Sequence, residues 1–151
     1  MNPEAKARAL SLLDRRDYSR KMLIDKLCEK AISTADAEEV ADWLCSLRVV
    51  DDSRYAGIVV RHYAAKGYGK KRIEQELYRR GIARELWDTA LEEMPEQESA
   101  LDKLLQSRLR GDFSPESRKK AAAAAQRRGY GWEEIRSAME RLQSEDDIWM
   151  N

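Results

Sequence analysis

The chain has 151 residues, and its 28 Lys and Arg residues balance its 28 Asp and Glu residues, for a net charge of zero. Total charge therefore gives no reason to expect a polyanionic partner, and only the distribution of charge can supply one. No apolar run approaches the roughly 20 residues of a membrane span. Cys28 and Cys45, in a chain without a signal-peptide-like start, indicate reduced thiols in a cytoplasmic protein.

The composition predicts an all-α protein. Only 3 prolines and 7 glycines interrupt a chain rich in Ala, Leu, Glu, Lys and Arg, which are good helix formers. Apolar periodicity and capping signals predict helices at about residues 5–14, 20–31, 35–47, 53–66, 70–80, 84–93, 97–110, 115–125 and 132–142.

These helices fall into three similar units. An aromatic residue stands directly before a capping residue at Tyr18-Ser19, Tyr68-Gly69 and Phe113-Ser114, and Arg79-Arg80-Gly81-Ile82 recurs as Arg127-Arg128-Gly129-Tyr130. We therefore expect a single domain of three tandem three-helix repeats, which would stack into an elongated, curved molecule. The repeats are placed at residues 1–49, 50–94 and 95–143, and residues 144–151 form an acidic tail that is expected to fray.

Positive charge collects on the middle helix of every repeat. From Lys66 to Arg84 seven basic residues stand against two acidic ones, a net charge of +5. Residues 15–30 carry +3 and residues 118–128 carry +5. Such runs often do no more than solvate helix faces, but their recurrence at three aligned places favours a polyanion or an acidic protein surface as partner. The candidate binding residues are Arg20, Lys21, Lys26, Lys70, Lys71, Arg72, Arg79, Arg80, Arg118, Lys119, Arg127 and Arg128.

Residues typical of catalysis are not arranged for it in the sequence. His62, the one histidine, is predicted to pack against the core, and the two cysteines have no histidine at metal-ligand spacing. Asp51 and Asp52 suit a helix N-terminus. Tyr68, Tyr78 and Tyr130 could stack on bases, although the first and last are better explained as core or staple residues. We therefore expect a non-enzyme without a metal ion or cofactor.

Several of these residues together resemble the RecX family, the regulatory proteins of the RecA recombinase. The resemblance covers roughly residues 5–142 and is carried by Asp51-Asp52-Ser53-Arg54-Tyr55-Ala56, Lys66-Gly67-Tyr68-Gly69, Ile73, Glu76-Leu77 and Gly81-Ile82. It implies tandem three-helix units and a modulator that lies in the groove of the RecA–DNA filament. Such a modulator suppresses ATPase, strand exchange and coprotease activity, and we expect it to be a monomer that binds single- and double-stranded DNA weakly and with salt dependence.

Three departures from the family pattern bear on the fold. Arg48 and Ala31 stand where glycine is usual, which weakens two predicted helix caps, and Ala124 and Ala125 replace larger apolar residues in the third repeat. Two other functions remain open on the sequence alone: an autonomous non-specific DNA-binding protein, and a helical scaffold for an unrelated partner. The zero net charge and the lack of an outward-facing Asn or Gln cluster for base readout argue against the autonomous DNA-binding protein.

Overall fold

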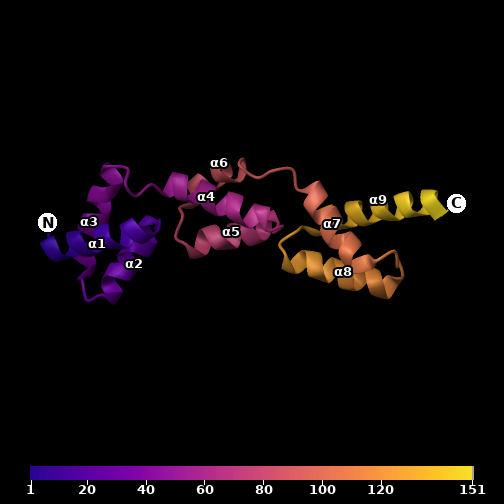
Figure 1. Ribbon diagram of the computed structural model, residues 1–151, viewed down its shortest axis with the longest axis horizontal. Helices are drawn as coiled ribbons and strands as arrows, with labels where there is room; N and C mark the ends of the chain where they lie inside the picture. Colours follow the sequence, from indigo (N-terminus) through magenta and orange to yellow (C-terminus); the bar gives the residue numbers. More distant parts are fainter. Residues whose placement is uncertain (151) are drawn as a thin grey trace. The chain divides into compact units, whose positions relative to one another are not determined.

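The computed structural model describes residues 1–150, and their backbone contains helices, turns and loops but no strand (Figure 1). The all-α prediction is confirmed. The helices are α1 (Pro3–Arg15), α2 (Arg20–Glu29), α3 (Thr34–Ser46), α4 (Asp52–Ala65), α5 (Lys70–Arg79), the 3-10 helix η1 (Arg84–Leu86), α6 (Trp87–Leu91), α7 (Glu98–Leu109), α8 (Pro115–Arg127) and α9 (Trp132–Met150). None of the described helices is both long and apolar enough to cross a membrane.

Side-chain caps start the helices where the sequence predicts them. The Ser19 hydroxyl accepts a hydrogen bond from the Met22 amide at the start of α2, and Ser114 does the same for Ser117 at the start of α8. Pro115 occupies the first turn of α8, where its missing N–H costs nothing. The prediction of capped middle helices is therefore confirmed for α2 and α8.

The helix ends use the left-handed backbone region, with or without glycine. Gly67, Gly81 and Gly129 have φ angles of +86°, +75° and +98°. Ala31 and Arg48 adopt the same conformation, with φ of +65° and +58°, although a side chain makes it unfavourable. The two caps whose glycine is missing are thus formed, and they carry strain.

Three sequence predictions are wrong. Glu145, Asp146 and Asp147 do not fray but continue α9 to Met150; Asn151 lies outside the described residues. The helix predicted at 84–93 begins as 3-10 and is α-helical only from Trp87 to Leu91. His62 is exposed, whereas its neighbour Tyr63 is half-buried on α4.

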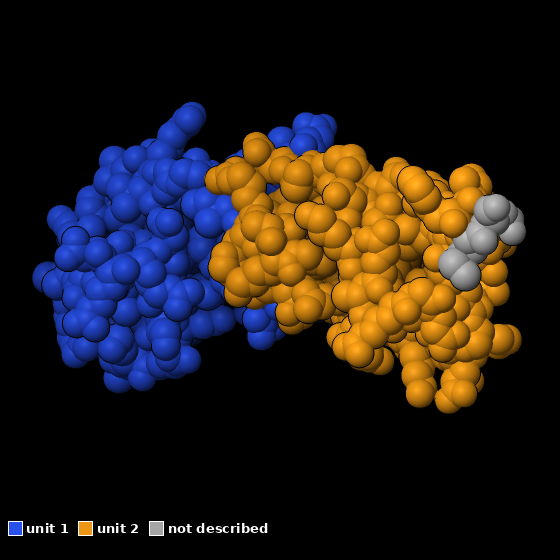
Figure 2. All heavy atoms as spheres, turned by 45° about the vertical axis from the view of Figure 1, so that its right-hand side comes forward, with its two compact units in different colours: residues 1–59, 76–92 blue, residues 60–75, 93–151 orange. Residues whose placement is uncertain are grey.

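The described chain divides into two compact units, residues 1–59 with 76–92 and residues 60–75 with 93–151 (Figure 2). The boundaries pass through α4 and α5. Each unit has its own apolar core, the first around Leu23, Leu27 and Leu44, the second around Leu105 and Ile135. In the second core, the alanines of α8 let the neighbouring helices approach closely, as Ala121 and Ala125 are fully buried. The repeat boundaries predicted from the sequence remain a prediction.

Candidate functional site

The candidate basic residues lie on α2, α5 and α8 or directly after them, but they differ in exposure. Arg20, Arg72, Arg80 and Arg128 are half-buried. The others are exposed: Lys21, Lys26, Lys70, Lys71, Arg79, Arg118, Lys119 and Arg127. This division separates cations with partly buried side chains from cations whose side chains lie in solvent.

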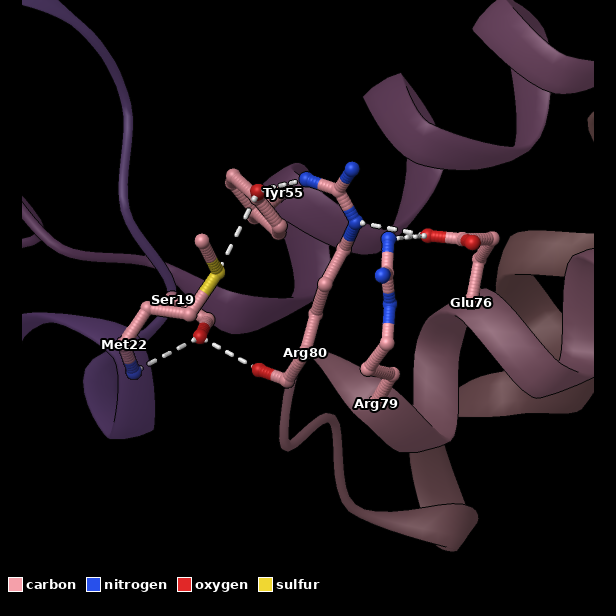
Figure 3. Close-up of polar contacts among 6 residues, drawn as sticks. All are labelled: Ser19, Met22, Tyr55, Glu76, Arg79 and Arg80. Atoms are coloured by element: carbon pink, nitrogen blue, oxygen red, sulfur yellow. Dashed lines mark hydrogen bonds and ion pairs between the residues drawn. The ribbon is translucent and has the colours of Figure 1, made fainter. Parts of the chain in front are cut away.

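Arg80 belongs to a polar cluster in the first unit (Figure 3). Its backbone carbonyl accepts a hydrogen bond from the buried Ser19 hydroxyl at 2.5 Å, joining the end of α5 to the start of α2. Its guanidinium donates to the Tyr55 hydroxyl at 2.5 Å and to the Glu76 carboxylate at 3.2 Å. Arg79 also donates to Glu76, at 2.9 Å, but its side chain is 69% exposed.

Glu76 anchors both arginines. It is 1% exposed, and a buried carboxylate needs such cationic donors to remain charged. Tyr55 extends the cluster, since its hydroxyl donates to the Met22 sulfur at 3.5 Å. The sequence gives Glu76 as part of a family signature but does not show this role.

The joint between α8 and α5 in the second unit is built mainly from backbone. The amides of Gly69 and Lys71 donate to the carbonyls of Arg128 and Gly129, at 2.7 and 3.1 Å. A Cβ atom added to Gly69 would lie 2.6 Å from the Gly129 carbonyl carbon, so only glycine permits this approach. The carbonyl end of α8 thus satisfies the amide end of α5.

Side chains surround this joint. The Arg128 guanidinium donates to the Lys66 carbonyl at 3.0 Å and lies over the Tyr68 ring, 5.0 Å from its centroid. Arg72 lies over the same ring from 5.4 Å. The Tyr130 hydroxyl donates to the Gly67 carbonyl at 2.8 Å, and burial raises the pKa of Tyr130, which keeps the hydroxyl a donor.

The signature residues make capping and packing contacts. Asp51 accepts from the Arg54 amide at 3.1 Å and caps α4, while Asp52 reaches back to accept from the Arg20 amide at 2.8 Å. Ile73, Leu77 and Ile82 are buried. Of the three tyrosines considered for stacking, Tyr130 is buried, Tyr68 is half-buried and packed, and Tyr78 is 78% exposed.

The candidate cations differ in their ion pairs. In the first unit, Arg20 pairs with Asp42, Lys21 with Asp25, and Lys26 with Glu29. Five exposed candidates form no ion pair within residues 1–150, and all five belong to the second unit: Lys70, Lys71, Arg118, Lys119 and Arg127. We call these five residues the unpaired cations.

The described residues contain no group of three or more His, Cys, Asp or Glu side chains placed to hold a metal ion. Cys28 and Cys45 are both free and half-buried. Burial raises the pKa of the Cys45 thiol, which favours its uncharged form. The features that stand out are thus the two polar joints and the unpaired cations.

Fold and site together define an all-α protein of tandem three-helix domains with a cationic surface. Residues 5–44 match the first three-helix domain of RecX, and residues 51–91 match the second. The chain is 38% identical over 135 residues to the regulatory protein RecX of Xanthomonas axonopodis pv. citri, covering 87% of this chain and 83% of the relative. It is 31% identical over 138 residues to the regulatory protein RecX of Vibrio campbellii, covering 89% of each.

A solved structure shares the fold. RecX from Lactobacillus salivarius superposes with a TM-score of 0.83 and 22% sequence identity, covering 93% of this chain and 95% of that one. With the two matched domains and these curated relatives, the chain belongs to the RecX family of regulatory proteins.

Proposed function

We propose that this chain is a negative modulator of the RecA recombinase. It binds in the groove of the RecA–DNA filament and suppresses ATPase, strand exchange and coprotease activity. It acts in the cytoplasm, has no catalytic activity of its own and uses no cofactor. Support comes from membership of the RecX family, whose curated relatives are called regulatory proteins.

The observation that carries the proposal is the group of unpaired cations. Five exposed positive charges in one compact unit have no ion pair within the described chain, in a protein whose net charge is zero. Leaving cations exposed and unpaired contributes little to stability, whereas DNA phosphates or an acidic protein surface would neutralise them. They are the proposed contact with the filament.

The other candidate residues receive smaller roles. Arg72, Arg80 and Arg128 are assigned to packing and to the joints, because their side chains already have ring, carboxylate or carbonyl partners. Arg20, Lys21 and Lys26, which belong to the first unit, are paired with acids and are assigned a weaker contact with the partner. Arg79 is shared, since it holds Glu76 and is still largely exposed.

The test is DNA-dependent ATP hydrolysis by RecA, measured while this protein is titrated in. We expect hydrolysis to fall at amounts well below that of RecA, which would favour capping or propagated disassembly over simple coating. Unchanged hydrolysis with intact helical circular dichroism would overturn the proposal. Tight, salt-sensitive binding to naked DNA under those conditions would instead identify an autonomous DNA-binding protein.

A further inference from the structure

An apolar groove with a cationic rim runs between α8 and α9, which lie side by side (Figure 1). Its volume is about 460 Å³, within the range of protein binding pockets. The floor includes Ala122, Ala123, Ile135 and Met139. Trp132, at the start of α9, lines it and is 54% exposed.

The rim of the groove is mostly positive. Arg118, Lys119 and Arg136 line it, against one acid, Glu140. Arg136 is already paired with Glu133, whereas Arg118 and Lys119 are unpaired cations, so an occupant of this groove competes with the filament for these two residues. A groove between two helices with such a rim suits an amphipathic helix that carries acidic residues beside large apolar ones.

The chain itself supplies a helix of this kind. The last described turns of α9 contain the acids Glu145, Asp146 and Asp147, followed by Ile148 and Trp149. Ile148 is 73% exposed and Trp149 is 88% exposed, so both present apolar surface to solvent. We call residues 145–149 the α9 end. Its charge is opposite to that of the groove rim, and its two large side chains suit the apolar floor.

The α9 end cannot reach the groove of its own molecule. Trp132 and Trp149 lie on one continuous helix, 17 residues and therefore about 26 Å apart along its axis. We propose that the α9 end of one copy docks into the α8–α9 groove of a second copy. The contact is heterologous, so it joins two different surfaces and extends to further copies wherever its rotation does not close a ring.

The apolar floor favours this occupant over nucleic acid. Arg118 and Lys119 could hold phosphates, but the methyl groups and thioether below them offer no partner to a sugar–phosphate chain, whereas Ile148 and Trp149 would bury apolar surface there. The contact is small, so the association is weak and the chain is a monomer when dilute.

The test is sedimentation velocity of the full chain at low ionic strength, between micromolar and millimolar concentrations. We expect the average mass of the wild type to rise with concentration and to fall again when salt is added. A groove variant (Arg118→Glu with Lys119→Glu) and an end variant (Ile148→Ser with Trp149→Ser) should each weaken self-association at least about tenfold. Ile58→Ser, on the exposed part of α4, is the matched control and should associate like the wild type.

Mixing the two defective variants gives the decisive result. The groove variant retains its α9 end and the end variant retains its groove, so an equal mixture should form heterodimers and nothing larger. A wild type that stays monomeric at every concentration, or a mixture that stays monomeric while the wild type associates, would overturn the proposal. Loss of thymidine-oligonucleotide binding by the groove variant, with a monomeric wild type, would assign the groove to nucleic acid instead.

Discussion

At the scale of single residues, two adjacent arginines at the end of a middle helix have different tasks. Arg80 and Arg128 give their carbonyls to the capping residue of the preceding repeat, Ser19 or Gly69, and bury part of their side chains. Their neighbours Arg79 and Arg127 are exposed. Consecutive residues of an α-helix point about 100° apart, so one arginine of each pair packs against the protein and the other faces solvent.

The sequence alone cannot make this distinction. The Arg-Arg-Gly repeat is visible, and it predicts the helix end and the positive charge. Which arginine faces inward depends on partners 61 and 59 positions away, Ser19 for Arg80 and Gly69 for Arg128. The prediction for His62 is wrong because one step around α4 separates it from the half-buried Tyr63, and His62 itself is exposed.

Two positions need glycine for different reasons, and mutation can separate the reasons. At Gly69 the packing leaves no room for a side chain, and at Gly111 the backbone conformation is unfavourable for one. A Cβ atom at Gly69 would lie 2.6 Å from the backbone of Gly129, but at Gly111, where φ is +78°, it would meet nothing within 4 Å. We expect Gly69→Ala to destabilise by about 1–3 kcal/mol through overpacking, and Gly111→Ala by about 1 kcal/mol through strain. Urea denaturation measures both. If Gly69→Ala lost no more unfolding free energy than Gly111→Ala, the backbone at the α5–α8 joint would have to move apart at little cost.

At Ala31 the reverse substitution, alanine to glycine, is expected to stabilise the protein. The φ of +65° at Ala31 is strained for alanine, and its side chain is exposed. Ala31→Gly should therefore stabilise the protein by about 0.5–1 kcal/mol, because the relief of strain exceeds the added flexibility of the unfolded chain. The midpoint of urea denaturation should rise. A lower midpoint would mean that the alanine side chain contributes more than its exposure indicates.

At the scale of helices, each compact unit contains one end-to-end joint. The carbonyl end of α5 meets the capping Ser19 of α2, and the carbonyl end of α8 meets the amide end of α5. Joined in this order, the helix dipoles attract. The joints also explain why α2 and α5 have no acid in their first turns, since the neighbouring helix supplies the negative end there.

Ser19 should therefore contribute more to the free energy of unfolding than an ordinary N-cap residue does. It accepts from the Met22 amide and donates to the Arg80 carbonyl, and it is fully buried. We expect Ser19→Ala to cost about 2–3 kcal/mol, because a cap and a buried carbonyl's partner are both lost. Ser33→Ala is the matched control: Ser33 caps α3 but is exposed, so its loss should cost about 1 kcal/mol. Similar losses for both would contradict a joint at Ser19.

Most helices were predictable because their caps are local. Ser114-Pro115 predicts the start of α8 and Gly81 predicts the end of α5, and the structure has both helix ends at these residues. The persistence of α9 to Met150 was not predictable from acidic composition alone. Its last turns include the half-buried Asp146, so contacts beyond the local sequence support them.

At the scale of the whole molecule, a net charge of zero conceals an uneven distribution. The candidate cations Arg20, Lys21 and Lys26 of the first unit have acidic partners, whereas the unpaired cations of the second unit do not. The zero total argues against indiscriminate binding to polyanions, and the unpaired cations allow a local contact. The partner is expected to engage these unpaired cations.

The salt dependence of DNA binding should reflect this. If Lys70 and Lys71 each contact one phosphate, Lys70→Ala with Lys71→Ala should reduce the slope of log K against log salt by about 1.4 on single-stranded DNA. Lys21→Ala with Lys26→Ala should leave the slope nearly unchanged, because both lysines have acidic partners. Fluorescence anisotropy at several salt concentrations measures the slopes. Equal reductions for the two pairs would refute the distinction between paired and unpaired cations.

The most direct test of the unpaired cations compares two charge reversals as inhibitors of RecA ATP hydrolysis. Lys70→Glu with Lys71→Glu changes unpaired cations on α5 and leaves Arg72, which packs on Tyr68, in place. Lys21→Glu with Lys26→Glu makes the same change on α2. We predict that the first pair raises the concentration for half-inhibition at least about tenfold and that the second raises it much less. Full inhibition by the first pair, with unchanged helical circular dichroism, would contradict the account.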